Sequence, residues 1–206
     1  MITKAQGPDD SLALGEGADP ALSSYYRLMR LKRLYRQGWL KRGLPAELCE
    51  SVAEHSFGTA LLALLLAPSG GASRAEGASL DRSKATLMAL VHELGEAYAG
   101  DITPVDGVPR EEKTRLERES ILRALEGHSD LTWFLDLWEE FERGESPEAR
   151  FVRELDRLEM GLQAALHRAE GHPGMEEFFA SARRSVSSPA LRSLLEDAIA
   201  ASGPGS

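Results

Sequence analysis

Histidine and carboxylate side chains that suit a metal ion occur in three stretches of this sequence, each beside apolar residues. The candidate ligands are His55, His92, Glu93 and Asp156. Neutral imidazole and carboxylate together suit a borderline divalent ion such as Mn, Fe, Co, Ni or Zn. Such an ion activates a water molecule and neutralises a phosphoryl oxygen. These residue types therefore indicate metal-dependent hydrolysis.

The spacing of these residues is a weak signal by itself. His92 and Glu93 are neighbours, so on a helix their side chains point about 100° apart and converge only at a helix edge. A lone histidine such as His55 is more often a hydrogen-bonded core or surface group, and Asp156 alone is more often solvated or ion-paired. The residues alone leave both interpretations open.

The elements that must position these side chains are helices. Apolar residues recur at helical spacing, and Gly and Pro residues end the runs. This pattern predicts helices over residues 21–35, 52–66, 84–98, 110–127, 131–143 and 147–170, with one or two short helices after them. The helix over 52–66 is apolar on most faces and is expected at the centre of the core. With no strand pattern and no repeat, the fold class is all-α.

The domain is expected to cover residues 21–201 as a single unit. Residues 1–20 predict a flexible N-terminal tail and residues 202–206 a short C-terminal tail, while 68–80 and 101–109 read as loops. His128, His167 and His172 lie near charged or turn-forming stretches and are interpreted as surface residues. The aromatic-rich helix over 131–143 either covers the core or faces a partner.

Composition narrows the classes of partner. The 206 residues carry a net charge of -9, so a nucleic-acid polymer is not expected as a partner, whereas a small anionic substrate is compatible with a metal and a few local arginines. Cys49 is the single cysteine, which fits a reducing compartment. No apolar run approaches the ~20 residues that span a bilayer. No membrane contact and a cytoplasmic location are therefore expected.

Several strings in order resemble the HD-domain phosphohydrolases, and more narrowly their 5′-deoxynucleotidase branch. The strings occupy residues 51–56 (SVAEHS), 90–97 (LVHELGEA), 100–104 (GDITP) and 152–160 (VRELDRLEM), with further similarity at 36–39, 109–113 and 137–141. The similarity runs from about residue 28 to residue 169. The resemblance implies a helical bundle of the HD type, one divalent transition metal ion, a nucleotide substrate and a homodimer.

The resemblance also implies roles by position. His55, His92 and Asp156 match metal ligands, while Glu96 and Asp101 match catalytic or substrate-orienting acids. Arg36 and Trp39 match a pair that lies over the nucleotide and selects deoxyribose, and Ile102, Thr103 and Pro104 match a loop lining the substrate site. Taken without the resemblance, Arg36 could be a solvated base and Trp39 ordinary core packing.

One position departs from the pattern, because the resembling proteins have Asp where this chain has Glu93. The extra methylene moves the carboxylate by roughly 1.5 Å, whereas metal ligation tolerates about ±0.2 Å. Glu93 could still bind through another rotamer, shift the preferred metal, or leave the site weak.

The leading hypothesis is a metal-dependent phosphatase of (deoxy)ribonucleoside 5′-monophosphates. In it, Glu96 lies one helical turn after His92 and beside the metal, where it or Asp101 moves a proton. The alternatives are a nucleotide- or metal-binding protein in which Glu93 has weakened catalysis, and a hydrolase of another small phosphoester.

Overall fold

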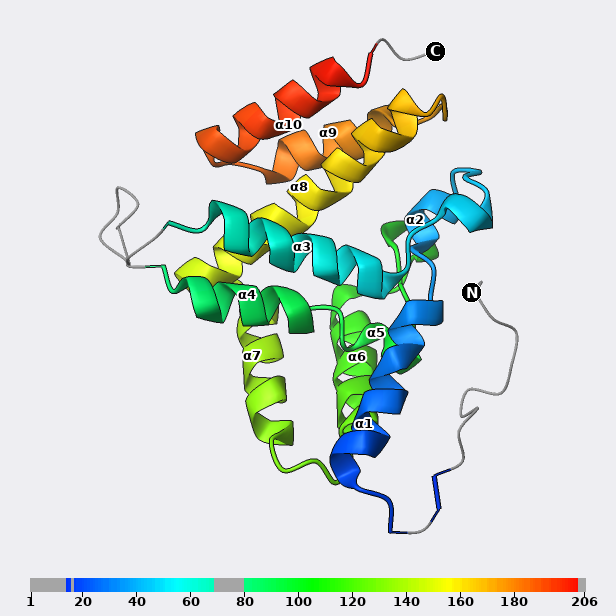
Figure 1. Cartoon of the computed structure of the whole chain (residues 1–206), viewed down its shortest axis with the longest axis vertical. Coiled ribbons are helices and arrows are strands. Elements are labelled where there is room, and N and C mark those ends of the chain that lie inside the picture. The colour runs from blue at the N-terminus through cyan, green and yellow to red at the C-terminus, as the bar shows by residue number, and fades with distance from the viewer. Residues whose placement is uncertain (1–13, 16, 69–79, 204–206) are drawn as a thin grey trace. The chain divides into compact units, whose positions relative to one another are not determined.

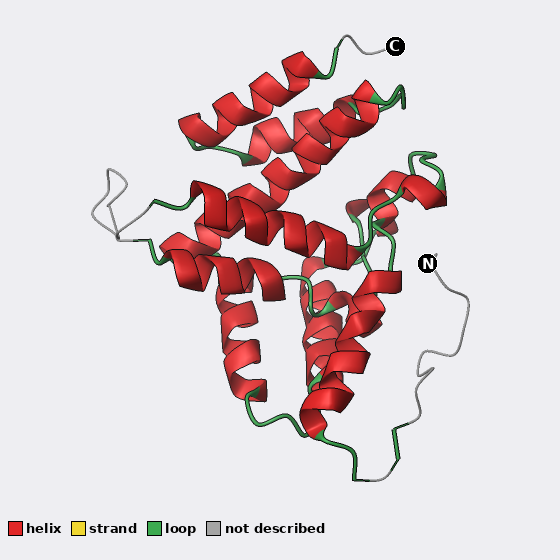
Figure 2. Ribbon diagram, in the orientation of Figure 1, coloured by secondary structure: helices red, strands yellow, loops and turns green. Residues whose placement is uncertain are grey.

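The regular structure of the chain is helical. The computed structural model describes residues 14–15, 17–68 and 80–203, and no strand occurs among them (Figures 1 and 2). The all-α prediction is therefore confirmed. Most of the predicted N-terminal tail, the loop residues 69–79 and the last residues 204–206 lie outside the described residues. No helix in the described part is both long enough and apolar enough to cross a bilayer.

The chain forms two compact units, each built from two separate stretches. The first unit comprises Met1–Ser56 and Val91–Glu142, and the second comprises Phe57–Leu90 and Arg143–Ser206. The single-domain expectation for residues 21–201 stays a prediction beside this division.

The described part of the first unit contains helices and apolar clusters. One cluster consists of Leu31, Leu34, Val52 and Ala97, and another of Ile121, Leu125 and Trp138. Its elements are α1 (Pro20–Leu28), η1 (Met29–Arg33), α2 (Gln37–Leu40), η2 (Ala46–Leu48), the start of α3 (Val52–Leu66), α5 (Glu96–Ala99), η4 (Pro104–Asp106), α6 (Arg110–Ala124) and α7 (Leu131–Arg143). Since Trp138 is buried and Trp133 is half exposed, α7 covers the core of this unit with one face.

The prediction of one helix over residues 21–35 was wrong in its second half. The α-helix ends at Leu28, a 3-10 turn follows, and Leu34 becomes extended. Arg36 N then donates to Glu50 O at 3.0 Å, and Val52 N donates to Leu34 O at 2.9 Å. These bonds satisfy backbone groups that a longer helix would have paired internally. They also place the segment after Leu34 beside the residues before α3.

The prediction of one helix over residues 84–98 was also wrong. α4 (Arg82–Val91) ends before His92, and α5 begins at Glu96. In the turn between them, Leu94 N donates to Val91 O and Glu96 N donates to Glu93 O, both at 3.0 Å and both one residue tighter than α-helical bonds. Gly95 lies against α6, where a Cβ would come within 2.6 Å of Glu117 Cβ. Only glycine fits this close approach.

The second unit holds the rest of α3 with α4, α8 (Pro147–Ala169), α9 (Glu176–Ser185) and α10 (Pro189–Ala201). α8 packs against α9 and α10, and a Cβ at Gly161 would come within 2.6 Å of Leu195 Cδ1. Ser146 caps α8 by accepting from Ala149 N at 3.1 Å. His167 is buried in this unit, so its interpretation as a surface residue was wrong.

The helix expected at the centre of the core, α3, is buried on one face and exposed on another. Ala60 and Ala63 are buried, but large apolar side chains of the same helix are exposed. Together with two exposed leucines of α4, these side chains are Phe57, Leu61, Leu64, Leu65, Leu87 and Leu90. We call these six residues the α3–α4 apolar face.

Candidate metal centre

Two buried histidines of the first unit face one carboxylate oxygen. Glu93 Oε1 lies 3.9 Å from His55 Nε2 and 3.6 Å from His92 Nε2. The possible ligand atoms of these three residues all lie within 4.8 Å of one another. Both imidazoles are almost completely inaccessible to solvent. Three predicted ligands that are distant or adjacent in sequence therefore converge on one small volume.

The spacing of these donor atoms fits a transition-metal ion. Ligand atoms bind such an ion at about 2.0–2.2 Å, so two tetrahedral donors lie about 3.4 Å apart. The separations of 3.6 and 3.9 Å around Glu93 Oε1 are close to this value. Two imidazole nitrogens and a carboxylate oxygen also form a donor set suited to a borderline divalent ion.

A capping box fixes His55 at the start of α3. Glu54 N donates to Ser51 Oγ at 3.2 Å, and Ser51 N donates back to Glu54 Oε2 at 2.5 Å. This reciprocal pair satisfies backbone donors that the first helical turn leaves open. The Ser-x-x-Glu spacing therefore sets the helix start and holds His55 in its first turn.

His92 and Glu93 can converge because they lie in the turn after α4 and not within a helix. The 100° separation of helical neighbours does not apply there. Phe141 packs its ring edge-on against the His92 imidazole, with 5.2 Å between the ring centroids. The aromatic contact limits the orientations of the imidazole and leaves Nε2 directed towards Glu93.

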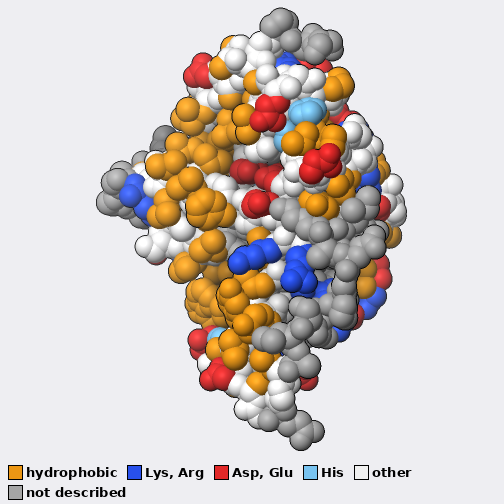
Figure 3. All heavy atoms as spheres, turned by 45° about the vertical axis from the view of Figure 1, so that its right-hand side comes forward, with side chains coloured by type: hydrophobic (Ala, Val, Ile, Leu, Met, Phe, Trp, Pro, Cys, Tyr) orange, Lys and Arg blue, Asp and Glu red, His pale blue; other side chains and the backbone are white. Residues whose placement is uncertain are grey.

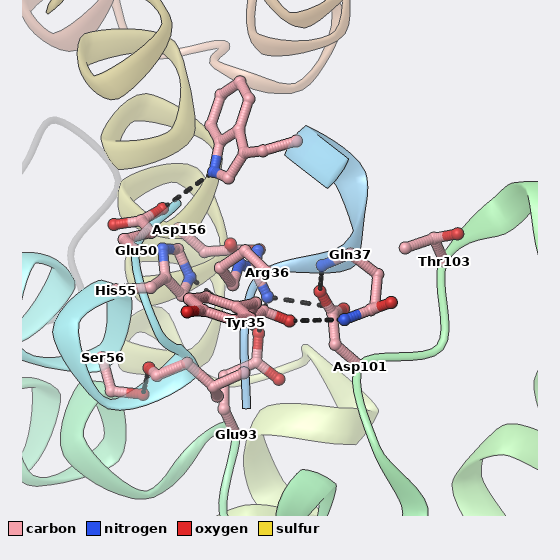
Figure 4. A network of polar contacts seen from close by, with 12 residues as sticks. Tyr35, Arg36, Gln37, Glu50, His55, Ser56, Glu93, Asp101, Thr103 and Asp156 are labelled. Atoms are coloured by element: carbon pink, nitrogen blue, oxygen red, sulfur yellow. Dashed lines mark hydrogen bonds and ion pairs between the residues drawn. The ribbon is translucent and has the colours of Figure 1, made fainter. Parts of the chain in front are cut away.

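Arg36 connects the ligand carboxylate to a predicted catalytic acid. Its Nη1 lies 3.3 Å from Glu93 Oε1 and 3.6 Å from Asp101 Oδ1. Asp101 Oδ2 accepts a hydrogen bond from Gln37 N at 2.6 Å. Figure 4 shows the Arg36 side chain and the Gln37 backbone N–H directed towards Asp101. The structure thus brings Arg36, Glu93 and Asp101 together, while their roles at the site stay predictions.

Glu96 is a buried acid near the same groups. Burial raises the pKa of Glu96 well above its ordinary value, and the negative charges of Glu93 and Asp101 raise it further. The positive charges of Arg36 and Lys113 act in the opposite direction. A carboxyl group in these surroundings holds its proton to a higher pH than an exposed one, which is the property of a general acid.

Trp39 and the loop after Asp101 differ in their exposure. Trp39 is 2% exposed and its indole N–H donates to Glu50 Oε1 at 3.1 Å, as expected of a core residue. Ile102 and Thr103 are half-buried and Pro104 is exposed. Thr103 caps η4 together with Asp106. The substrate-lining roles of these four residues stay predictions.

Asp156 lies on α8 in the second unit. It is buried, and its Oδ2 lies 3.5 Å from Arg157 Nε. Its role as a metal ligand stays a prediction from the resemblance.

Two residues of α6 that the sequence interpretation passed over lie near the site. Lys113 Nζ lies 3.2 Å from Glu117 Oε1, and Glu117 is buried. In the sequence both stand in a highly charged run that is typical of a solvated helix face. The sequence signal against a solvated face is Gly95, because a glycine within a helical pattern often marks a close backbone approach.

The sequence of this chain is similar to those of known proteins. Residues 28–197 match the HD domain family. A protein of Bos taurus named 5′-deoxynucleotidase HDDC2 is 35% identical over 187 residues, which cover 89% of this chain and 86% of the relative. The protein of the same name from Dictyostelium discoideum is 36% identical over 173 residues, covering 80% of this chain and 89% of that relative.

Two solved structures are similar to this chain over most of its length. The crystal structure of PH0347 protein from Pyrococcus horikoshii OT3 superposes with a TM-score of 0.68 at 32% identity, covering 88% of this chain and 98% of that one. A conserved hypothetical protein from Pyrococcus furiosus gives a TM-score of 0.69 at 29% identity, covering 86% and 98% of the two chains.

Proposed function

Because the chain belongs to the HD domain family, we propose that it is a metal-dependent phosphohydrolase that removes phosphate from deoxyribonucleoside 5′-monophosphates. The observation that carries this proposal is the convergence of His55, His92 and Glu93 beside Arg36. Relatives named 5′-deoxynucleotidases, which share about a third of their residues over most of the chain, support the substrate class.

The proposed ligands of the ion are His55, His92, Glu93 and Asp156. The first three are supported by their mutual spacing. Asp156 is supported by the family resemblance of residues 152–160. A bound divalent ion, of which Mn, Co, Fe, Ni and Zn are the candidates, would lower the pKa of water and neutralise phosphate charge.

The remaining polar residues have roles that follow from their surroundings. Arg36 is a bidentate donor that can bind a phosphate oxygen in place of its ion pair with Glu93. The raised pKa of Glu96 supports a role as the acid that donates a proton to the leaving sugar oxygen. Asp101, fixed by Gln37 N, orients Arg36 and accepts a hydrogen bond from the attacking water or the substrate.

Phosphate release from a nucleotide panel tests this proposal. The panel pairs each deoxyribonucleoside 5′-monophosphate with its ribose analogue and with a 3′-monophosphate, after metal stripping and re-addition of single metals. We expect release from 5′-deoxynucleotides, with 3′-nucleotides inert. An absence of release with all five metals would contradict the proposal. A non-nucleotide phosphoester is added to the panel, and preferred release from it would favour a hydrolase of another small phosphoester.

A second candidate is a binding protein with little turnover, in which Glu93 replaces the usual Asp. The distances argue against a misplaced carboxylate, because Glu93 Oε1 reaches both histidines. Nucleotide binding without hydrolysis, and recovery of hydrolysis in Glu93→Asp, would support this candidate instead.

We also propose that the protein forms a homodimer in the cytoplasm. Hydrophobic side chains lie exposed at the surface (Figure 3), and the α3–α4 apolar face groups six of them without a charged member. Such a face can pair with its own copy without like-charge repulsion, despite the net charge of -9. Light scattering on Leu65→Glu, which we expect to be monomeric, tests this, with Leu194→Glu on α10 as the matched control that should stay dimeric.

A further inference from the structure

The first turns of α6 lie against the turn that carries the candidate ligands. A Cβ at Gly95 would come within 2.6 Å of Glu117 Cβ and 3.1 Å of its Cα, so the two backbones are nearly in contact. Tyr98 N donates to Ser120 Oγ at 2.9 Å, which fastens α5 to the same helix. The position of α6 relative to residues 92–98 is therefore closely fixed.

Lys113 lies one helical turn before Glu117 on this same face of α6. Its Nζ lies 3.2 Å from Glu117 Oε1. The Glu117 side chain is 6% exposed, whereas that of Lys113 is 36% exposed. Glu117 thus anchors the ammonium group from the interior, while the Lys113 side chain stays partly exposed.

Two of the carboxylates whose charges act on Lys113, Glu93 and Glu96, belong to the candidate site. Burial lowers the pKa of Lys113, but the charges of Glu93, Glu117 and Glu96 outweigh it and hold the pKa above its ordinary value. Lys113 in turn acts on Glu96 in the same direction as Arg36 does. Arg36, just before α2, and Lys113, on α6, therefore both lower the pKa of Glu96.

The charge of the site calls for such a cation. A phosphate monoester brings one to two negative charges to a place already occupied by the carboxylates of Glu93 and Asp101. Like charges at short range in a partly buried site repel strongly. A divalent ion and Arg36 offset only part of this repulsion, and a nearby ammonium group can bind the remaining phosphate oxygens as a point charge.

We propose that Lys113, held in place by Glu117, is a phosphate-binding residue of this site and selects substrates with a terminal phosphate. This inference rests on the proposed function, because it assigns a further contact to the same substrate. It predicts that Lys113 contributes to the binding of the phosphate group and not to that of the nucleoside or the metal.

Calorimetry on the metal-loaded protein, with inorganic phosphate and with deoxyadenosine as separate probes, tests the assignment. Loss of one charge-assisted contact should weaken phosphate binding in Lys113→Met by about 10- to 100-fold. Deoxyadenosine affinity and metal content by elemental analysis should not change. For deoxyadenosine 5′-monophosphate, KM should rise by more than kcat falls, and Lys113→Arg should recover most of the phosphate affinity.

Arg115→Met is the matched control. It removes one positive charge from the same helix, but Arg115 pairs with Glu112 and Glu119 and is about half exposed. We expect it to bind phosphate as the unsubstituted protein does. Equal losses in Lys113→Met and Arg115→Met would indicate a general field effect and overturn the assignment, as would loss of metal or of deoxyadenosine binding in Lys113→Met.

The test separates this inference from the proposed function. A protein that hydrolyses no nucleotide, yet loses phosphate affinity selectively in Lys113→Met, would support the phosphate contact and contradict the hydrolase. A protein that hydrolyses 5′-deoxynucleotides, but whose phosphate affinity is unchanged in Lys113→Met, would support the hydrolase and contradict the phosphate contact.

Discussion

Glu93 Oε1 lies 3.6 Å from Nε2 of its chain neighbour His92, a distance that the turn after α4 makes possible. Within a continuous helix the two side chains would point about 100° apart. The same oxygen lies 3.9 Å from His55 Nε2. The site therefore requires that α4 ends at Val91. The length of the Glu93 side chain sets the distances from its carboxylate to the two histidines.

Shortening this side chain should weaken the site. Glu93→Asp withdraws the carboxylate by roughly 1.5 Å, more than metal ligation tolerates. We expect lower metal occupancy by elemental analysis and a fall in kcat of about 10-fold or more. Glu93→Gln keeps the length but removes the charge, and should also lose metal. A rise in turnover in Glu93→Asp would contradict the assignment and favour the binding-protein alternative.

The turn that follows α4 should depend on Gly95. In Gly95→Ala the added methyl group would meet Glu117 Cβ at 2.6 Å and its Cα at 3.1 Å. Because backbone must move to relieve this contact, we expect a loss of about 1–3 kcal/mol in the free energy of unfolding, measured by urea denaturation. Metal affinity should fall with it, since the turn carries two ligands. Gly15→Ala, whose Cβ would meet nothing within 4 Å, is the control and should change neither.

Stability should vary with pH through Glu117. Burial and the charge of Glu93 raise the pKa of Glu117 from 4.5 to about 7, against the opposing charge of Lys113. Between these values the unfolded chain has released a proton that the folded chain retains, so folding stability falls as pH rises and levels off above pH 7. Glu117→Gln removes the titrating group and with it this loss of folding stability. In chelator, the variant should gain up to about 3 kcal/mol over the unsubstituted protein between pH 4.5 and 7.

A constant difference between the two proteins across this range would contradict the raised pKa of Glu117. The same variant should bind phosphate more weakly, because Lys113 loses its anchor. A protein that is more stable and yet binds phosphate less well would separate the roles of Glu117 in folding and in binding.

Much of the helical architecture was predictable because apolar periodicity and strong stop signals determine it. α3 begins and ends where the pattern predicted, at Val52 and Leu66, and α7 likewise spans Leu131–Arg143. The misplaced ends were at positions where tertiary contacts override local preference. The bonds of Leu34 and Arg36 to residues near α3 ended the first helix, and packing of Gly95 on α6 divided the helix over 84–98.

The site was predictable to the extent that motifs carry it. His55, His92 and Glu93 converge as the resemblance to HD-domain proteins indicated, and Arg36 and Asp101 meet beside them. Lys113 and Glu117 could not be found in this way, because a helix rich in Lys, Arg and Glu resembles a solvated surface. The buried Glu117 packs against Gly95, a contact that no local pattern encodes.

The most direct test of the central claim is phosphate release from a deoxyribonucleoside 5′-monophosphate by stripped protein titrated with a single divalent metal. We expect no release from the stripped protein, recovery that saturates near one bound ion per chain, and neither binding nor recovery in His92→Asn. His128→Asn, which alters a histidine outside the cluster, should behave as the unsubstituted protein. Full activity in His92→Asn, or undiminished release after stripping, would contradict the account.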